Sequence, residues 1–237
     1  MNTKETQLQE MLTQLRTRLL VMFAAVDIAM NESCDALQNS NKGKARAVID
    51  GDRVINDKEN EIDELALSIL IRNQPVAHDL RLVVGALRMV GELERIGDEA
   101  VGIAFRVLDI EDKVPSVVIN AVAPLIEKAQ SLFHAVNALF KNATSDDVFS
   151  ICEQKNDISK LELEALHQIM DKLGKLPEEN CGSDESCSLS QGILITRSLN
   201  RICGRSINLA EQVYFIENGI NIKHKKKKSM RRHNLTR

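Results

Sequence analysis

An unbroken apolar stripe between residues 82 and 107 constrains the fold of this chain more than any other feature. Apolar side chains recur there at alternating steps of four and three, at Leu82, Ala86, Met89, Leu93, Ile96, Ala100, Ile103 and Val107. Steps of this size return to one face of an α-helix, and that face must be buried against other elements. The stripe therefore predicts a long helix that packs in a helical bundle.

The composition and the turn signals extend this prediction to the whole chain. Of the 237 residues, 43% are hydrophobic and only 3% are aromatic, which does not suit a protein built from β-strands. Polar turns, prolines and capping residues divide the chain into six helical stretches. These are residues 5–40, 44–72, 75–109, 115–142, 145–173 and 188–218. Pro75 and Pro115 are expected in first helical turns, and Thr144 with Asp147 resembles a capping box.

An internal repeat groups these stretches into two similar halves. A shift of 106 residues lays SLNRICGRSINLA (198–210) onto the equivalent segment of the first half, so that Leu93, Arg95, Ile96 and Ala104 meet Leu199, Arg201, Ile202 and Ala210. Long helices joined by short turns pack most simply as antiparallel bundles. We predict an all-α protein of two tandem three-helix bundles, residues 1–110 and 115–220, followed by a tail at 221–237.

Charge is distributed unevenly along the chain. Residues 223–237 (KHKKKKSMRRHNLTR) hold eight Lys and Arg and no acid, whereas residues 1–222 hold 23 basic and 34 acidic side chains. We expect a disordered tail with at most peripheral membrane contact, and the acidic body argues against direct binding of nucleic acid. No apolar run approaches the roughly 20 residues that cross a bilayer, and the first residues are too polar for a secretory signal, so we expect a cytoplasmic protein.

Two carboxylates interrupt an apolar row in the third stretch. Glu94 and Asp98 are four residues apart, so they are neighbours on one helical face, where like charges repel by a few tenths of a kcal/mol. The second stretch carries a matching polar face, formed by Asp52, Asn56, Glu59 and Asp63. Packing of the two helices would bring these oxygen atoms together.

Two interpretations of this acidic face follow from the residues alone. Several hard oxygen ligands without nearby Cys or His favour iron, manganese or magnesium. The alternative is that the acids pair with Arg53, Arg88 or Arg95, or face water, as acidic helix faces commonly do. Spacing alone leaves both interpretations open.

Other candidate motifs are incomplete. Glu164 and His167 form only one half of the Glu-x-x-His pair that di-iron bundles need on two helices. Cys181 and Cys187 lack the spacing and the further ligands of a zinc site, so we expect two loop thiols. The sequence contains no Gly-rich phosphate loop and no G-x-S-x-G elbow. We therefore predict a protein that is not an enzyme.

Three segments carry a resemblance to a known family. VIDGDRVINDKENEIDELALSIL (48–70), QPVAHDLR (74–81) and ELERIGDEAVGIA (92–104) closely resemble the PhoU family of phosphate-uptake regulators. The resemblance implies two three-helix bundles and a non-enzymatic negative regulator. It also implies two partners, the ATPase of the phosphate ABC transporter and a membrane sensor histidine kinase that controls phosphate-starvation genes. A homodimer is expected as well.

The resemblance also bears on the acidic face. The family's E-x-x-x-D motif, one per bundle, binds metal in some members, commonly iron; Glu94 and Asp98 match it, with Asp52 and Asp63 on the matching acidic helix. We expect a cation such as Fe, Mn or Mg at these four residues. A carboxylate-bridged metal protein with a redox or storage role is the alternative function.

The second repeat has lost these acids. Asn200 and Gly204 stand at the positions of Glu94 and Asp98. Gln154 and Ile158 occupy the facing helix when it is aligned at an offset of 102 residues. A neutral amide and a glycine contribute little to holding a multivalent cation. We predict metal in the first bundle only.

Overall fold

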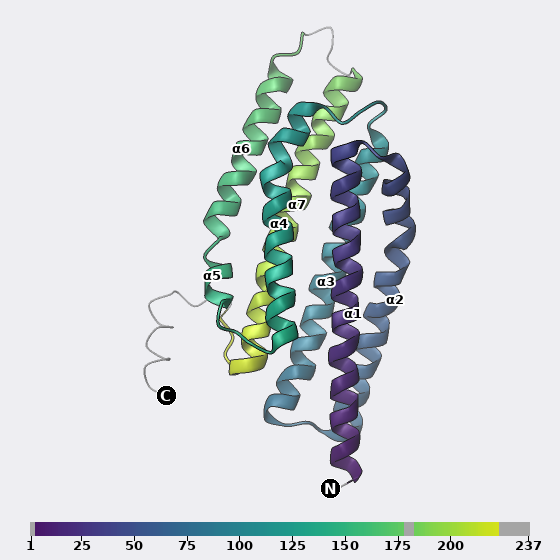
Figure 1. Ribbon diagram of the computed structural model, residues 1–237, viewed down its shortest axis with the longest axis vertical. Helices are drawn as coiled ribbons and strands as arrows, with labels where there is room; N and C mark the ends of the chain where they lie inside the picture. The colour runs from purple at the N-terminus through teal and green to yellow at the C-terminus, as the bar shows by residue number, and fades with distance from the viewer. Residues whose placement is uncertain (1–2, 178–182, 223–237) are drawn as a thin grey trace.

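The computed structural model describes residues 3–177 and 183–222. Within these ranges the chain forms only helices, which are α1 (Thr3–Asn39), α2 (Lys42–Asn73), α3 (Ala77–Asp109), α4 (Ser116–Asn142), α5 (Val148–Cys152), α6 (Lys155–Gly174) and α7 (Asp184–Asn218). Six of them are long and run up and down the long axis of the molecule (Figure 1). The predicted all-α fold with six long helices is confirmed. Apart from its first two residues, the predicted tail lies outside the described residues.

The fifth predicted stretch, residues 145–173, is not one helix. The structure divides it into the single-turn α5 and the longer α6, with a turn at Glu153 and Gln154. The predicted capping box is also wrong, because Asp147 precedes α5 without a side-chain cap and Thr144 Oγ1 accepts a long hydrogen bond of 3.4 Å from the Asp146 amide. This amide lies outside any helix, so the bond does not cap one.

The boundaries of the other long helices differ from the prediction by one to four residues at one or both ends. The last helix begins at Asp184 rather than at 188, because the Ser183 hydroxyl accepts a hydrogen bond from the Ser186 amide and caps the helix there. Pro75 lies before the first turn of α3, and Pro115 is the residue that precedes α4. These are ordinary errors for helix ends, where backbone hydrogen bonds change partner over one or two residues.

The long helices form two bundles that pack against each other. Helices α1, α2 and α3 form one bundle, and α4, α6 and α7 form the other (Figure 1). Every residue of the apolar stripe in α3 is buried. The two bundles meet where α3 packs on α7 and α1 packs on α4, and their buried side chains form one continuous core.

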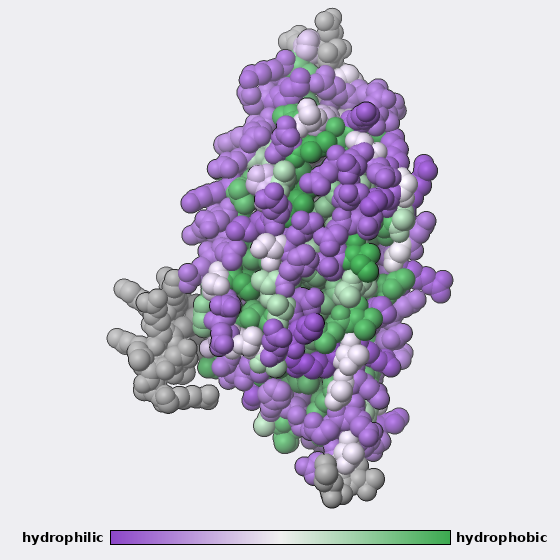
Figure 2. Space-filling model, in the orientation of Figure 1, coloured by the Kyte–Doolittle hydropathy of each residue, from purple (hydrophilic) through white to green (hydrophobic). Residues whose placement is uncertain are grey.

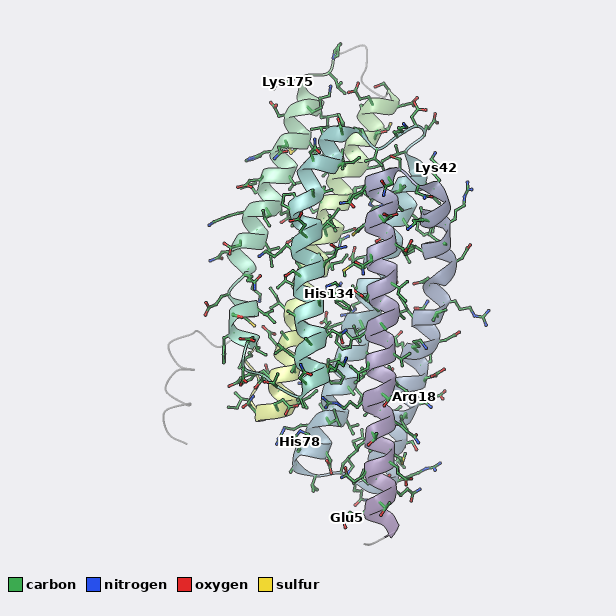
Figure 3. The ribbon with its side chains drawn as sticks, in the orientation of Figure 1. Glu5, Arg18, Lys42, His78, His134 and Lys175 are labelled. Atoms are coloured by element: carbon green, nitrogen blue, oxygen red, sulfur yellow. The ribbon has the colours of Figure 1, made fainter. Side chains whose placement is uncertain are left out.

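Aromatic side chains join the bundles between α1 and α4. The fully buried ring of Phe23 contacts the rings of Phe133 and Phe140, with centroids 5.5 and 5.7 Å apart. At the surface of the same contact, the His134 Nε2 atom lies 2.8 Å from the Asp27 carboxylate, and Figure 3 shows His134 on α4 beside α1. The core therefore crosses the boundary between the repeats.

Helices α3 and α7 are antiparallel along the other contact. Arg88 pairs with Gln212, Glu92 with Asn208, and Glu99 with Arg201, so residue numbers rise along α3 as they fall along α7. The Glu99–Arg201 pair is bidentate, with distances of 2.5 and 2.7 Å. Helix α7 therefore covers one side of α3, and α2 packs against another side.

Candidate metal centre

The close approach of α2 and α3 sets the register of the acidic residues. A Cβ atom on Gly97 would lie only 2.8 Å from Ile55 Cδ1, so the two helices come together at this glycine. Along α3, Glu94 and Asp98 lie on either side of the approach, and Asp52 and Glu59 do so along α2. The fold thus places acids from both helices along one seam.

Glu94 and Asp98 interact directly. Burial raises the pKa of Glu94 to about 7, and the charge of Asp98, a hydrogen bond between the two carboxyl groups and the charge of Glu59 act in the same direction. A carboxyl group with this pKa is about half protonated at neutral pH, and its protonated form can donate a hydrogen bond to Asp98.

Two acids of α2 belong to the same electrostatic cluster. Burial raises the pKa of Glu59, and the charges of Asp63 and Asp98 raise it further. Burial alone raises the pKa of Asp63. Glu59, which the sequence placed on this face without assigning it as a ligand, is therefore an electrostatic neighbour of both Glu94 and Asp98. Its spacing of four from Asp63 was the signal for it.

Asp52 lies at the other end of the acidic face. Its Oδ2 atom accepts a hydrogen bond of 2.9 Å from the Asn56 amide nitrogen. Its Oδ1 atom is buried and has no hydrogen-bond partner. A buried carboxylate oxygen without a donor is unfavourable unless a cation or water satisfies it. This oxygen atom is therefore chemically suited to bind a cation.

The predicted arginine partners do not neutralise the cluster through ion pairs. Arg53 pairs with Asp57 at 3.6 Å, and the Arg88 guanidinium lies over the Phe215 ring. Arg95 lowers the pKa of Glu94 and of Glu59 through its charge, without an ion pair to either among the described residues. The carboxylates therefore lie near one another. The Arg95 guanidinium is a nearby positive charge, but it forms no ion pair with Glu94 or Glu59 among the described residues.

The side chains are not gathered into a formed metal cage. Within residues 3–177 and 183–222, no three Asp, Glu, His or Cys side chains converge closely enough to hold an ion. The donor set fits a hard cation in its chemistry, since every candidate ligand is a carboxylate oxygen. Binding would require the carboxylates to come closer together, and the prediction of a metal at Glu94, Asp98, Asp52 and Asp63 stays a prediction.

The equivalent region of the second bundle has a different character. Asn200 is half-buried, and a Cβ atom on Gly204 would meet nothing within 4 Å. The Gln154 side chain accepts a hydrogen bond of 3.0 Å from Lys128 Nζ, and Ile158 is buried in the core. A lysine there adds positive charge where the first bundle has acids.

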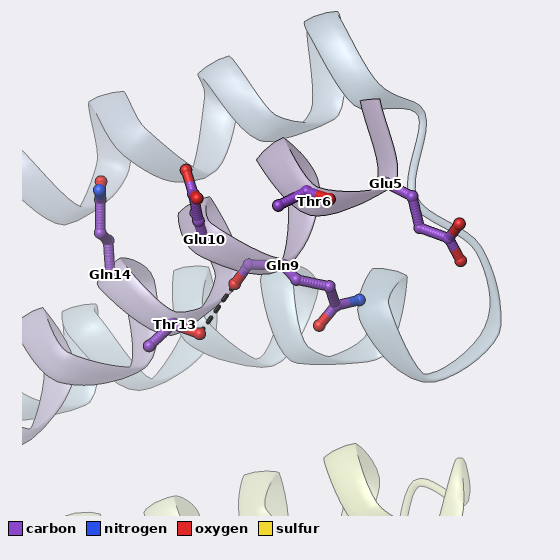
Figure 4. Close-up of a pocket in the computed structure, with 6 residues that line it drawn as sticks. All are labelled: Glu5, Thr6, Gln9, Glu10, Thr13 and Gln14. Atoms are coloured by element: carbon purple, nitrogen blue, oxygen red, sulfur yellow. Dashed lines mark hydrogen bonds between the residues drawn. The ribbon is translucent and has the colours of Figure 1, made fainter. Parts of the chain in front are cut away.

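The remaining candidates do not form a site. Glu164 and His167 are exposed on α6, Cys187 is exposed in the first turn of α7, and Cys181 lies outside the described residues. A hollow of about 650 Å³ is lined only by α1, at Glu5, Thr6, Gln9, Glu10, Thr13 and Gln14. Figure 4 shows these side chains along a single helix, with Thr13 donating to the Gln9 carbonyl oxygen. They do not converge on a common point.

Two repeated three-helix bundles, with Glu94 and Asp98 in the first and with Asn200 and Gly204 at the equivalent positions of the second, define the class of this protein. The pattern of the PhoU domain matches residues 19–107 and 122–213, and each match lies within one predicted bundle. The chain belongs to the PhoU family.

Relatives and solved structures agree with this assignment. The chain is 29% identical to the phosphate-specific transport system accessory protein PhoU homolog of Pseudomonas putida, over 90% of this chain and 81% of that protein. It is 26% identical to PhoU of Escherichia coli, over 90% and 86% of the two chains. The crystal structure of PhoU from Pseudomonas aeruginosa superposes with a TM-score of 0.81 at 28% identity, over 90% of this chain and 99% of that one. That of the phosphate transport regulatory protein PhoU from Streptococcus pneumoniae has a TM-score of 0.80 at 20% identity, over 91% and 99%, and shows the same fold.

Proposed function

We propose that this protein is a negative regulator of high-affinity phosphate uptake and of phosphate-starvation signalling, and that it acts by binding partners. The partners are the ATPase of the phosphate ABC transporter and the membrane sensor kinase. The observation that carries the proposal is the match of the PhoU domain to both halves of the chain. The relatives in Pseudomonas putida and Escherichia coli are named as accessory proteins of a phosphate-specific transport system, which supports it.

Three of the cysteines are poorly suited to act as nucleophiles. Burial raises the pKa of Cys34 and of Cys203 to about 12 and that of Cys152 to about 11. A thiol is nucleophilic only as the thiolate, so these three cysteines are unreactive at neutral pH. The proposal therefore assigns no catalytic residue.

The place of action follows from the partners. None of the helices in the described part of the chain is both long enough and apolar enough to cross a membrane. We place the protein in the cytoplasm, where a transporter ATPase and the signalling part of a kinase would be reached. The eight basic residues of 223–237 would add only peripheral attraction to an anionic membrane.

A pull-down from phosphate-replete cells tests the binding proposal. The full chain should recover the transporter ATPase or the sensor kinase. Cells grown in low phosphate provide the comparison, since a regulator that represses uptake when phosphate is abundant should hold its partners best in replete cells. Recovery of neither protein from replete cells would count against the proposal.

We further propose that the first bundle binds a hard cation, Fe, Mn or Mg, through Glu94 and Asp98 with Asp52 and Asp63. The mutual repulsion of the carboxyl groups and the unsatisfied Asp52 Oδ1 atom support this. Bound there, the ion would neutralise the cluster and hold α2 against α3. Glu59 belongs to the same electrostatic cluster and is a further oxygen donor.

Elemental analysis of purified protein tests the metal proposal. The double variant Glu94→Ala, Asp98→Ala should lose the metal. The double variant Asp157→Ala, Glu164→Ala removes two exposed acids of α6 and should keep it. Equal metal content in the two variants would remove the site. Stoichiometric iron with oxygen-dependent turnover would instead favour the redox or storage function.

A further inference from the structure

An apolar patch lies on the outer face of α1 and α2, away from the acidic seam. A groove of about 410 Å³ runs between the two helices there. It is lined by Ala25, Ile28, Ala29, Glu32, Ala47, Val48, Gly51, Val54 and Ile55. Figure 2 shows apolar surface gathered over the middle of α1 and α2, surrounded by polar side chains. Nothing in the described chain covers this patch.

The patch contains both projecting and small side chains. Ile28 is 64% exposed, and Val54 is 51% exposed. Each stands beside a small residue, Ala25 on α1 and Gly51 on α2. A Cβ atom on Gly51 would meet nothing within 4 Å, so open space lies above it. Knobs and hollows therefore alternate on the same surface.

An ion pair between the helices closes each end of the patch. At one end Arg18 on α1 pairs with Glu61 on α2 at 3.7 Å. At the other end Lys44 on α2 pairs with Glu32 and Asp35 on α1, at 2.9 and 3.0 Å. Figure 3 shows Lys42, which is close to Lys44 in the sequence, at the upper end of α2, and Arg18 a little below the middle of α1. At the Arg18 end of the patch, α1 carries the positive charge and α2 the negative one. At the Lys44 end, α1 carries the negative charges and α2 the positive one.

We propose that this patch is the interface of a symmetric dimer with a second copy of the chain. The two-fold axis crosses both helices, midway between Ala25 and Ile28 on α1 and midway between Gly51 and Val54 on α2. Each helix then faces its own counterpart in the antiparallel direction. The proposal assigns a surface to the homodimer expected from the sequence, and it does not depend on the role in phosphate regulation.

This one axis satisfies both the shapes and the charges. Ile28 faces Ala25 of the second copy, and Val54 faces the open space at Gly51 of the second copy. Arg18 comes opposite the acids Glu32 and Asp35, and Glu61 comes opposite Lys44. A two-fold interface requires a surface that complements itself in this way. A partner helix lying along the groove would instead pass over the charged pairs that close its ends.

The size of the patch indicates a dimer of moderate strength. Arg18 and Asp35 are 17 residues apart on α1, which is about 25 Å of helix. Two adjacent helices are about 20 Å wide, so each copy contributes a footprint of roughly 500 Å². Stable interfaces bury roughly 800 Å² on each partner, and weaker ones less. We therefore expect the dimer to dissociate on dilution.

Light scattering and sedimentation velocity on the full chain test the patch. The native protein should pass from monomer to dimer as its concentration rises. The double variant Ile28→Asp, Val54→Asp should remain monomeric, because four buried carboxylates per dimer would replace the apolar contact. As a matched control, Leu67→Asp with Ile71→Asp alters side chains that are 52% and 76% exposed outside the patch, and this variant should still dimerise.

A charge exchange tests the proposed axis. The variant Arg18→Glu and the variant Glu32→Lys, Asp35→Lys each place like charges opposite one another in their own dimers, so each should dimerise poorly alone. Mixed together they restore opposite charges at both ends, so the heterodimer should form. A native chain that stays monomeric at every concentration would overturn the proposal. So would an Ile28→Asp, Val54→Asp variant that still dimerises, or a mixture in which no heterodimer forms.

Discussion

Glu94 is the residue whose titration in the folded protein departs most from that of an ordinary carboxyl group on this acidic face. Its pKa is about 7, against 4.5 for an unperturbed glutamate. Between these values the folded chain holds a proton that the unfolded chain has released. The stability that this proton provides is therefore fully present below about pH 4.5 and is lost as the pH rises through about 7.

The variant Glu94→Gln tests this dependence. A glutamine keeps the shape without the charge, so the variant should have a higher free energy of unfolding than the native chain above pH 7. The two proteins should differ less near pH 4.5, where the native carboxyl group is protonated in the folded chain and half protonated in the unfolded chain. Urea unfolding at both pH values, in the presence of a chelator, measures the effect. A difference of the same size at both pH values would contradict the assigned pKa.

Two glycines of the long helices allow the effect of helix propensity on stability to be distinguished from the effect of packing between helices. A Cβ atom on Gly204 of α7 would meet nothing within 4 Å. A Cβ atom on Gly85 of α3 would lie 2.4 Å from Ile216 Cγ1, where α3 packs on α7. The same substitution to alanine should therefore have opposite effects at the two positions.

Gly204→Ala should stabilise the protein by about 1 kcal/mol, the difference in helix propensity between glycine and alanine. Gly85→Ala gains the same propensity, but it should destabilise the protein overall by roughly 1 to 3 kcal/mol because Ile216 must move within a packed core. Chemical unfolding of both variants measures the two changes. An unchanged or higher stability for Gly85→Ala would show that the α3–α7 contact is looser than described.

The helices differ in how far the sequence predicts them. The stripe in α3 is regular enough to fix both the helix and its buried face. The turn at Glu153 and Gln154 has no glycine or proline to signal it, so the division into α5 and α6 depends on packing against the rest of the bundle. Pro124 shows the converse, because it lies inside α4 without ending the helix. Local signals are weaker than tertiary contacts at both places.

The acidic face was predictable in part for a similar reason. Helical spacing puts Glu94 beside Asp98 and puts Glu59 beside Asp63, and the structure confirms that these residues interact. Which acid of α2 lies nearest to α3 depends on the approach at Gly97 and Ile55. That approach is a contact between helices, so no spacing within one helix reveals it.

The whole molecule should unfold as one unit although it is built from two repeats. Its buried side chains form one core that crosses from α1 to α4 and from α3 to α7. Phe23 of the first repeat packs on Phe133 and Phe140 of the second. A contact of this kind couples the stability of one bundle to that of the other.

The variant Phe23→Ala tests the coupling. It should cost roughly 3 to 5 kcal/mol, as expected for a fully buried aromatic residue. The chain has one tyrosine, Tyr214 in the second repeat, and no tryptophan, so tyrosine fluorescence reports on the repeat that was not altered. Circular dichroism and tyrosine fluorescence should show one coincident transition, shifted to lower urea. A fluorescence transition that stays in place while the helical signal shifts would show two independent bundles.

We propose that this member of the PhoU family represses phosphate uptake when phosphate is abundant. The most direct measurement deletes its gene and follows phosphate uptake and starvation-gene expression in cells grown in high phosphate, with the gene restored as the control. Phosphate uptake and starvation-gene expression should both rise in the deletion strain and return to normal when the gene is restored. Uptake and expression that are unchanged by the deletion would contradict it.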